Sequence, residues 1–393
     1  MISMCSALIT ACTTEDEAPP ETLMVSVETP TGVVQVEATI RDGLAIVDDD
    51  IVLGSEDDAR VAEVSNLRSA GRNLTTYRWP NGVVPYELDP TYDSDQRQAI
   101  LDAMREWYLI TPYRFVIHTN EPDYVYFLND SANNSSSIGR HGGKQYIRVA
   151  GRRPGLIEHE IGHALGLWHE QQRADRDNYV TVHLENVLPD KVPNFQTYVQ
   201  QGTDGRDLFP YDINSIMHYG SYAFSANTKP TITRKDGSTF DEQRDAPTDE
   251  DVGGAVRVLT YTDGQQTYTN VNGATGRCLD VQAASYTRGA PINNYTCHGG
   301  DNQRWIWWWI PWNGSYLLIN QRSGMCLDTS AFVSGTRVAQ QPCDGSLGER
   351  WDLSDGRLHS ASSPSWCVQA KSDWTATIEP CDGGTDQKWA FNY

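Results

Sequence analysis

The stretch His159-Glu160-Ile161-Gly162-His163-Ala164-Leu165-Gly166-Leu167-Trp168-His169-Glu170 decides the fold of this chain. On a helix, residues four apart lie on one face, so the imidazoles of His159 and His163 can converge on one metal ion. Gly166 can adopt the positive φ that ends a helix and turns the chain back, which brings His169 to the same ion. Three protein ligands leave a coordination position open, which is typical of a catalytic rather than a structural zinc site.

A second element of the pattern is the carboxylate beside the first ligand. Glu160 is placed to act as a base on a water at the metal rather than on the metal itself. A bare HExxH also occurs on amphipathic helices with solvent-facing histidines, so alone it leaves both interpretations open. The added glycine and third histidine, at the metzincin spacing, favour the metal site. A candidate methionine turn follows further along the chain, in Ser215-Ile216-Met217-His218-Tyr219.

Taken together, HExxHxxGxxHE and the later SxMHY resemble the astacin family of zinc metalloendopeptidases. The resemblance covers about residues 73–261, with supporting segments at 79–86, 137–140, 142–143 and 169–173. It implies an α+β, metzincin-like catalytic domain with two subdomains around a zinc cleft. It also implies a set of roles: one Zn²⁺ held by His159, His163 and His169, Glu160 as general base and then acid, Tyr219 as a donor to the oxyanion, and Met217 beneath the metal. A buried core tyrosine is the alternative for Tyr219.

Two further residues acquire roles through the same resemblance. In astacins the residue matched by Glu170 contacts the new amino terminus after activation, which implies an N-terminal propeptide. Some members bind acidic residues just after the cut with a basic side chain, and Arg244 is the matching candidate for substrate binding. An ionic pairing at the surface is the alternative for Arg244.

Residues 13–72 fit a propeptide because they are rich in Asp and Glu, with few Arg and no Lys. Their segment 47–53 resembles the family motif in which an aspartate caps the zinc, although Val47 and Asp49 replace the family's phenylalanine and glycine. Asp50 is the candidate inhibitory ligand, because a carboxylate at the open metal position excludes water. A solvated acidic loop is the alternative. Activation would then need a cut between propeptide and catalytic domain, and the Arg72-Asn73 bond suits a trypsin-like enzyme.

The amino terminus indicates export. Residues 1–12 are mostly apolar but lack the basic start of a secretory signal. Ile9-Thr10-Ala11-Cys12 fits a bacterial lipoprotein cleavage site, so a lipid on Cys12 as a membrane tether is one expectation and plain secretion is the other. No other stretch approaches the 18 or so apolar residues of a membrane span. We expect an extracellular or cell-envelope protein in either case.

Six cysteines after residue 277 form an internal repeat. Cys278 and Cys297, Cys326 and Cys343, and Cys367 and Cys381 are three matched pairs. Six residues after the second cysteine of each pair comes a tryptophan motif: 303–305, 349–351 and 387–389. The constant offset predicts three copies of one structural unit.

This threefold QxW pattern resembles the ricin-type β-trefoil lectin domain, over about residues 265–393. The resemblance implies an all-β fold and one disulfide within each repeat, which requires an oxidising compartment. The first repeat alone carries the whole set of expected carbohydrate-binding residues: Asp280, Asn293, Tyr295, Asn302 and Gln303. The alternative is that Asp280 and Gln303 only brace the trefoil.

The net charge of −21 argues against nucleic acid as a partner. We therefore expect a secreted or lipid-anchored zinc metalloendopeptidase, made as a zymogen and directed to carbohydrate or glycoprotein by the trefoil, and monomeric. Its substrates would be proteins or peptides. Two alternatives remain open: a carbohydrate-binding adhesin with a vestigial protease, and a hydrolase of peptidoglycan peptides.

Overall fold

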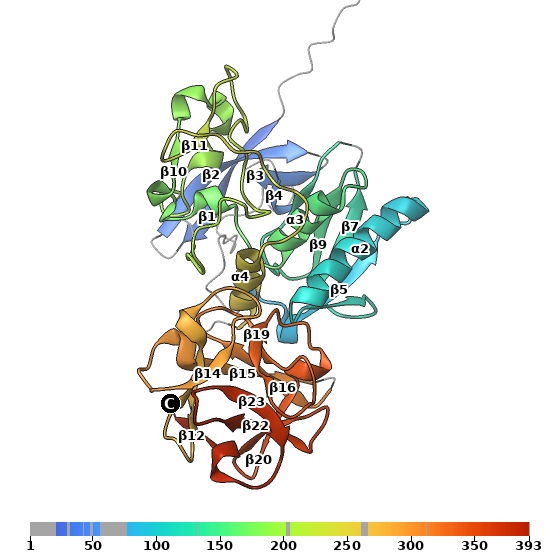
Figure 1. The fold of residues 1–393 in the computed structure, drawn as a ribbon. Helices are drawn as coiled ribbons and strands as arrows, with labels where there is room; N and C mark the ends of the chain where they lie inside the picture. The colour runs from blue at the N-terminus through green and yellow to red at the C-terminus, as the bar shows by residue number, and fades with distance from the viewer. Residues whose placement is uncertain are drawn as a thin grey trace, which may run out of the picture.

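The computed structural model describes residues 21–29, 32–41, 43–47, 50–55, 77–130, 132–201, 205–260, 266–311 and 313–392. A mixed α/β part extends to residue 260 and an all-β part follows it, as Figure 1 shows. This division confirms the predicted fold class. The expected leader at residues 1–12, its Cys12 and the expected Arg72-Asn73 cleavage bond lie outside the described residues. Among those described, no helix has the length and apolar character needed to cross a membrane.

A nine-stranded sheet is the frame of the α/β part, with strand order β1-β2-β3-β4-β8-β9-β7-β5-β6. Strands β5, β6, β7 and β9 are parallel neighbours, whereas β8 is antiparallel to β9. The strands of the acidic N-terminal segment join this sheet, because Ile51 on β4 pairs in parallel with Ser136 on β8. The bounds are β1 Thr22–Thr29, β2 Gly32–Arg41, β3 Leu44–Val47, β4 Ile51–Ser55, β5 Val83–Leu88, β6 Arg114–Ile117, β7 Tyr124–Asn129, β8 Ser135–Ser136 and β9 Lys144–Val149.

Three helices of the described residues complete the core of this part: α2 (Ser94–Ile110), α3 (Pro154–Ala164) and α4 (Asp249–Thr260). The N-cap of α2 is Asp93, whose carboxylate accepts hydrogen bonds from the backbone N–H of Asp95 and Gln96. The apolar face of α2 is buried, as its spacing predicts, at Ala99, Ile100, Ala103, Met104 and Trp107.

The second half of the α/β part holds little regular structure. A two-stranded sheet of β10 (Val180–Val182) and β11 (Ile232–Arg234) packs with Phe195 and Tyr219 in a small apolar cluster. Short 3-10 turns connect the rest, at η3 Glu170–Gln172, η4 Arg176–Asn178, η5 Leu184–Asn186 and η6 Pro189–Phe195, and a further one, η2 Pro80–Gly82, precedes β5.

The all-β part consists of three similar units. Its strands are β12 Tyr268–Asn272, β13 Cys278–Val281, β14 Ile292–Tyr295, β15 Arg304–Ile310, β16 Ser315–Asn320, β17 Cys326–Asp328, β18 Thr336–Arg337, β19 Ala339–Gln341, β20 Trp351–Ser354, β21 Arg357–Ser360, β22 Trp366–Ala370, β23 Ala376–Pro380 and β24 Trp389–Asn392. Its 3-10 turns are η7 Gln282–Ala284, η8 Asp301–Gln303, η9 Leu347–Glu349 and η10 Thr385–Gln387.

Each repeat buries its tryptophan in the same way. The indole N–H groups of Trp305, Trp351 and Trp389 donate to the backbone carbonyls that follow the first cysteine of each repeat, at 3.1, 2.8 and 2.9 Å. The three expected disulfides are formed, Cys278–Cys297, Cys326–Cys343 and Cys367–Cys381. The tryptophans and disulfides therefore supply the core that the sequence repeat predicts.

Helix α4 joins the two parts (Figure 1). Val256 on α4 packs into an apolar cluster with Ile306, Leu317 and Ile319 of the β part. At the start of α4, Asp249 forms an ion pair with Arg288 of the β part at 2.6 Å. The same helix thus contacts the β part and, as described below, supports the metal ligands.

Candidate metal centre and carbohydrate site

Helix α3 presents two of the three expected ligands. His159 and His163 lie one turn apart, and their Nε2 atoms are 3.1 Å from each other. The helix ends at Ala164, and Gly166 has a φ of +105°. A Cβ at Gly166 would meet a Val258 methyl carbon at 2.7 Å, so glycine is required by both backbone conformation and space.

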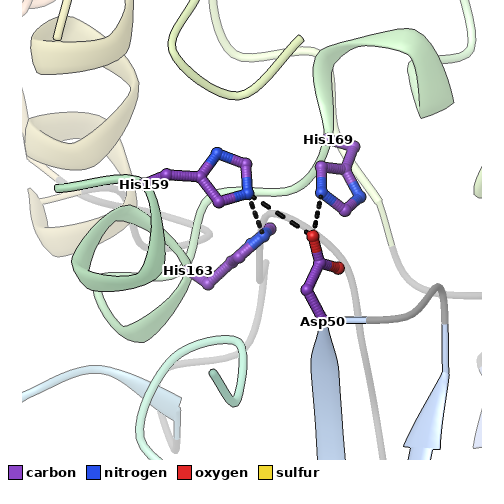
Figure 2. Close-up of side chains that lie close together, drawn as sticks. All are labelled: Asp50, His159, His163 and His169. Atoms are coloured by element: carbon purple, nitrogen blue, oxygen red, sulfur yellow. Dashed lines mark hydrogen bonds and ion pairs between the residues drawn. The ribbon is translucent and has the colours of Figure 1, made fainter. Parts of the chain in front are cut away.

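After this turn the chain reaches His169, whose ring centroid lies 4.7 Å from that of His163 and 5.4 Å from that of His159. The ligand atoms of these three histidines and of Asp50 all lie within 4.8 Å of one another. Figure 2 shows the four side chains facing a common point, with Asp50 approaching from the opposite side to α3.

The nitrogen atoms fit a zinc ion. The Nδ1 atoms of His159 and His163 donate to the backbone carbonyls of Ile216 and Leu167, each at 2.8 Å. These bonds fix the tautomers and leave the Nε2 lone pairs for a metal. Burial lowers the pKa of His159 to about 4 and lowers that of His163 well below its usual value, so both are held in the neutral form that metals bind.

Glu160 is a buried carboxyl group beside these ligands, with 2% of the residue exposed. Its Oε2 atom finds no hydrogen-bond partner among the described residues. Burial first, and then the Asp50 carboxylate, raise the pKa of Glu160 well above its usual value. A carboxyl group with a raised pKa and a free oxygen can both accept and return a proton.

The methionine turn forms the floor of the site. A Cβ at Gly162 would meet Met217 Sδ at 2.8 Å, which shows how closely Met217 packs against α3. Tyr219 is buried, and its ring centroid lies 4.6 Å from that of His169. The structure therefore brings both residues to the metal centre, where the sequence resemblance places them.

Asp251 is a supporting residue that the sequence pattern does not reveal. Its carboxylate accepts hydrogen bonds from Ser215 Oγ at 2.5 Å and from the N–H of Ile216 at 2.9 Å. The carbonyl of Ile216 in turn holds His159. Asp251 lies on α4, so the helix that contacts the β part also fixes the turn behind a metal ligand.

Glu170 is partly buried beside the site and already has hydrogen-bond and ion-pair partners. It accepts a hydrogen bond from the N–H of Asp212 at 2.9 Å and pairs with Arg173 at 3.2 Å. A cavity of about 60 Å³ adjoins Glu170, with Glu250 and Asp251 among its lining residues. Burial raises the pKa of Glu170 to about 8, although Arg173 acts in the opposite direction.

Arg244 lies near the metal centre but does not project freely into it. Its guanidinium donates to the carbonyl of His218 at 3.1 Å and lies 3.6 Å from the Glu242 carboxylate. Only 6% of the residue is exposed. The structure thus places Arg244 in a largely buried ion pair close to the candidate ligands.

Asp50 comes from the turn between β3 and β4. Its Oδ2 atom lies 3.0 Å from Nε2 of His169 and 3.5 Å from Nε2 of His159. Burial raises the pKa of the Asp50 carboxyl, but the adjacent histidines outweigh this effect and lower it overall. The N–H of Ser136 donates to the Asp50 carbonyl at 2.6 Å, which anchors the turn to the sheet.

The predicted carbohydrate-binding residues of the first repeat lie together. Asp280 Oδ2 accepts hydrogen bonds from Asn302 Nδ2 at 2.9 Å and Gln303 Nε2 at 2.8 Å. Tyr295 is 45% exposed nearby, whereas Asn293 Oδ1 accepts a hydrogen bond from an Arg337 Nη atom at 2.8 Å.

The later repeats differ at the matching positions. Asp328 and Gly348 stand in the second repeat where the first has Asp280 and Asn302, and Gln369 replaces the aspartate in the third. A Cβ at Gly348 would meet Asp328 Oδ1 at 2.3 Å, so no asparagine fits there without movement. The complete polar set thus belongs to the first repeat.

Residues 71–255 match the astacin family of peptidases. Residues 257–341 match the ricin-type β-trefoil lectin domain-like family, and residues 314–393 match the ricin-type β-trefoil lectin domain.

Known proteins are similar to a part of this chain. The chain is 41% identical to zinc metalloproteinase nas-14 of Caenorhabditis elegans, over 44% of this chain and 36% of that protein. It is 36% identical to meprin A subunit beta of Rattus norvegicus, over 43% of this chain and 24% of that protein. The solved structure of high choriolytic enzyme 1, a hatching enzyme zinc-protease from Oryzias latipes, is 36% identical over 46% of this chain and 92% of that chain, with a TM-score of 0.42.

The chain thus spans less than two thirds of the length of these two curated relatives. The family matches nevertheless cover both parts of the fold and agree with the resemblance drawn from the sequence. The chain therefore carries a peptidase domain of the astacin family, followed by a ricin-type β-trefoil lectin domain.

Proposed function

We propose that this chain is a zinc metalloendopeptidase that is made as a zymogen and is directed to its substrates by a carbohydrate-binding domain. The observation that carries this proposal is the convergence of the Nε2 atoms of His159, His163 and His169 beside the buried carboxyl of Glu160. Three imidazoles with one remaining position suit catalysis better than a structural role.

In this proposal, His159, His163 and His169 hold one zinc ion. When bound, the ion supplies a Lewis acid that polarises the scissile carbonyl and lowers the pKa of a water to roughly 7. Glu160 takes a proton from the attacking water and delivers it to the leaving amine. The Tyr219 hydroxyl donates a hydrogen bond to the oxyanion of the tetrahedral intermediate.

The N-terminal segment acts as the inhibitor in this scheme. The Asp50 carboxylate lies beside His169 and His159 (Figure 2). At this position it would compete with a substrate carbonyl for the metal. Because β4 pairs with β8, the same segment occupies the sheet edge next to the site. Removal of this segment, by a cut at Arg72-Asn73, would free the open metal position and the sheet edge. The small acidic cavity beside Glu170 suits the new amino terminus that this cut creates.

Two finer assignments belong to the same proposal. Arg244, which lies close enough to influence His159 and Glu160 electrostatically, would favour acidic residues just after the cut. The three disulfides support export to an oxidising compartment. Either plain secretion or lipid attachment at Cys12 would place the chain in that compartment.

The trefoil would bind carbohydrate at the first repeat. Asp280 is oriented by Asn302 and Gln303, so its carboxylate can accept hydrogen bonds from sugar hydroxyls, and Tyr295 offers an exposed ring for stacking.

The test compares the full chain with a form that begins at Asn73. Zinc content and cleavage of denatured casein are measured for both, with Glu160→Gln as the control that keeps all three histidines. We expect the shortened, zinc-loaded chain to cleave casein and the other forms to show no cleavage. Zinc binding without cleavage by any form would contradict the peptidase and favour the adhesin. Cleavage of purified peptidoglycan peptides but not of casein would favour the peptidoglycan hydrolase.

A further inference from the structure

Two large aromatic side chains from different repeats lie together on the trefoil surface. Tyr295 belongs to β14 of the first repeat, and Trp374 belongs to the turn between β22 and β23 of the third. They are 45% and 40% exposed. Their ring centroids lie 5.3 Å apart, and the ring planes are tilted by 47°. The sequence pattern, which compares equivalent positions within each repeat, does not reveal this pair.

Trp374 is held in an unfavourable backbone conformation. Its φ is +74°, which is rare for a bulky side chain. Its carbonyl accepts a hydrogen bond from the N–H of Asn294 at 2.8 Å, and Asp373 Oδ1 closes the turn by accepting from the N–H and Oγ1 of Thr375. The turn is therefore pinned to the strand that carries Tyr295. Backbone strain that the surroundings enforce is a feature of functional positions.

The aromatic pair is continuous with the polar site of the first repeat. The His298 ring lies 6.4 Å from the Tyr295 ring, and His298 Nε2 is 3.3 Å from Asp280 Oδ2. Asp280 itself is only 4% exposed and is fixed by its neighbours Asn302 and Gln303. A buried, oriented carboxylate next to exposed rings is the combination that recognises the hydroxyls and the apolar face of a sugar.

We propose that Tyr295 and Trp374 form a composite subsite, so that the first repeat binds a glycan of at least two consecutive pyranose units. This inference rests on the proposed carbohydrate binding. Two planes tilted by 47° cannot both lie flat against one pyranose ring, so each aromatic ring stacks on a different sugar unit. The guanidinium of Arg277 lies 3.6 Å from the centroid of the Trp374 ring and holds this ring in place.

The test uses the full chain and a panel of free pyranose monosaccharides, together with disaccharides that carry each of them at the non-reducing end. Binding is measured by titration calorimetry. The informative variant is Trp374→Gly, because glycine adopts a φ of +74° without strain and the fold is kept. Trp309→Ala is the matched control, since Trp309 is 47% exposed on the same domain and contacts Tyr316 instead. Near-ultraviolet circular dichroism checks the fold of each variant.

We expect the wild type to bind certain disaccharides about tenfold more tightly, in Kd, than the corresponding monosaccharides. Trp374→Gly should bind the disaccharides no more tightly than the monosaccharides. Asp280→Ala should abolish binding of both, and Trp309→Ala should leave both unchanged. If Trp374→Gly binds disaccharides as the wild type does while Asp280→Ala does not, the composite subsite is refuted and the carbohydrate site stands. If the wild type binds no sugar of the panel, the subsite and carbohydrate binding both fail, and the peptidase proposal is unaffected.

Discussion

Asp50 Oδ2 lies 3.0 Å from Nε2 of His169, although 119 positions of sequence separate the two residues. The contact exists because the β3–β4 turn projects from a strand that extends the sheet of the astacin domain at β8. Asp50 is also 3.5 Å from Nε2 of His159, and its Oδ1 has no hydrogen-bond partner among the described residues. Among the described residues, the side chains that contact this carboxylate are thus the candidate metal ligands.

This contact predicts that Asp50 keeps the uncut chain inactive. In Asp50→Ala, the uncut chain should hydrolyse a fluorogenic peptide at least about tenfold faster than uncut wild type, because the ligand that competes with substrate is gone. Electrophoresis must show that the chain has remained intact. Glu37→Ala, which removes an exposed carboxylate from the same segment, is the control and should remain silent. An uncut Asp50→Ala chain as inactive as the control would refute the role of Asp50.

Tyr219 should act on the transition state and not on substrate binding. Its ring adjoins His169, and it is buried with Phe195 and Phe224, so Tyr219→Phe removes one hydroxyl without a cavity. We expect kcat of the shortened form to fall by about a hundredfold, with KM little changed. Steady-state kinetics check this, with Tyr222→Phe, at a residue that is 52% exposed, as the control. An unchanged kcat would mean that Tyr219 is only a core residue.

Asp251 should act through the turn behind His159. Without its carboxylate, Ser215 Oγ and the N–H of Ile216 lose their acceptor, and the Ile216 carbonyl holds His159 less firmly. In Asp251→Ala, we expect zinc Kd to rise by about tenfold, the lower end of the effect of residues that orient a ligand. Competition with a chelator measures Kd. Asp249→Ala, on the same helix but paired with Arg288, is the control, and an equal Kd in both variants would contradict the prediction.

How much of the site the sequence could predict depends on where the contacts come from. His159, Glu160, His163 and His169 lie within one helix and one turn, so helical spacing and a glycine determine their geometry. The trefoil was predictable for a similar reason, since a repeat must bury its tryptophan in the same way each time. The N-cap of α2 is less predictable, because Asp93 and Ser94 are both suitable capping residues and Gln96 completes the capping box only with Asp93.

Contacts between distant segments were not predictable where no family motif marks the residues. Asp251 resembles any acidic residue in the first turn of a helix, and only the fold places it behind Ser215. Trp374 likewise has no motif of its own, since its neighbour Tyr295 comes from another repeat. A local sequence pattern does not predict these contacts, because only tertiary packing brings the residues together.

The second trefoil repeat has a buried carboxyl group, Glu349, at the position where the first and third repeats have the carboxamides Gln303 and Gln387. Gln303 Nε2 donates to the carbonyl of Thr296 at 2.9 Å, and Gln387 Nε2 donates to the equivalent carbonyl of Pro380 at 2.9 Å. Glu349 stands at the same place, is fully buried and cannot donate when ionised, and its Oε1 has no hydrogen-bond partner among the described residues.

Glu349→Gln should therefore stabilise the trefoil, by about 1–3 kcal/mol, because it restores a donor at a buried position. The gain should be larger at pH 8 than at pH 5. Burial, and then Asp344, raise the pKa of Glu349 well above its usual value and that of Asp328 to about 6. A carboxyl whose pKa is raised by folding binds its proton more tightly in the folded state, so wild-type stability falls as pH rises from the unfolded pKa, near 4, through the folded one.

Scanning calorimetry at both pH values measures the shift in Tm. Gln387→Glu, the converse change in the third repeat, should destabilise the trefoil with the same pH dependence. Equal shifts at pH 5 and pH 8 would show that the Glu349 carboxyl does not ionise at a cost to the fold.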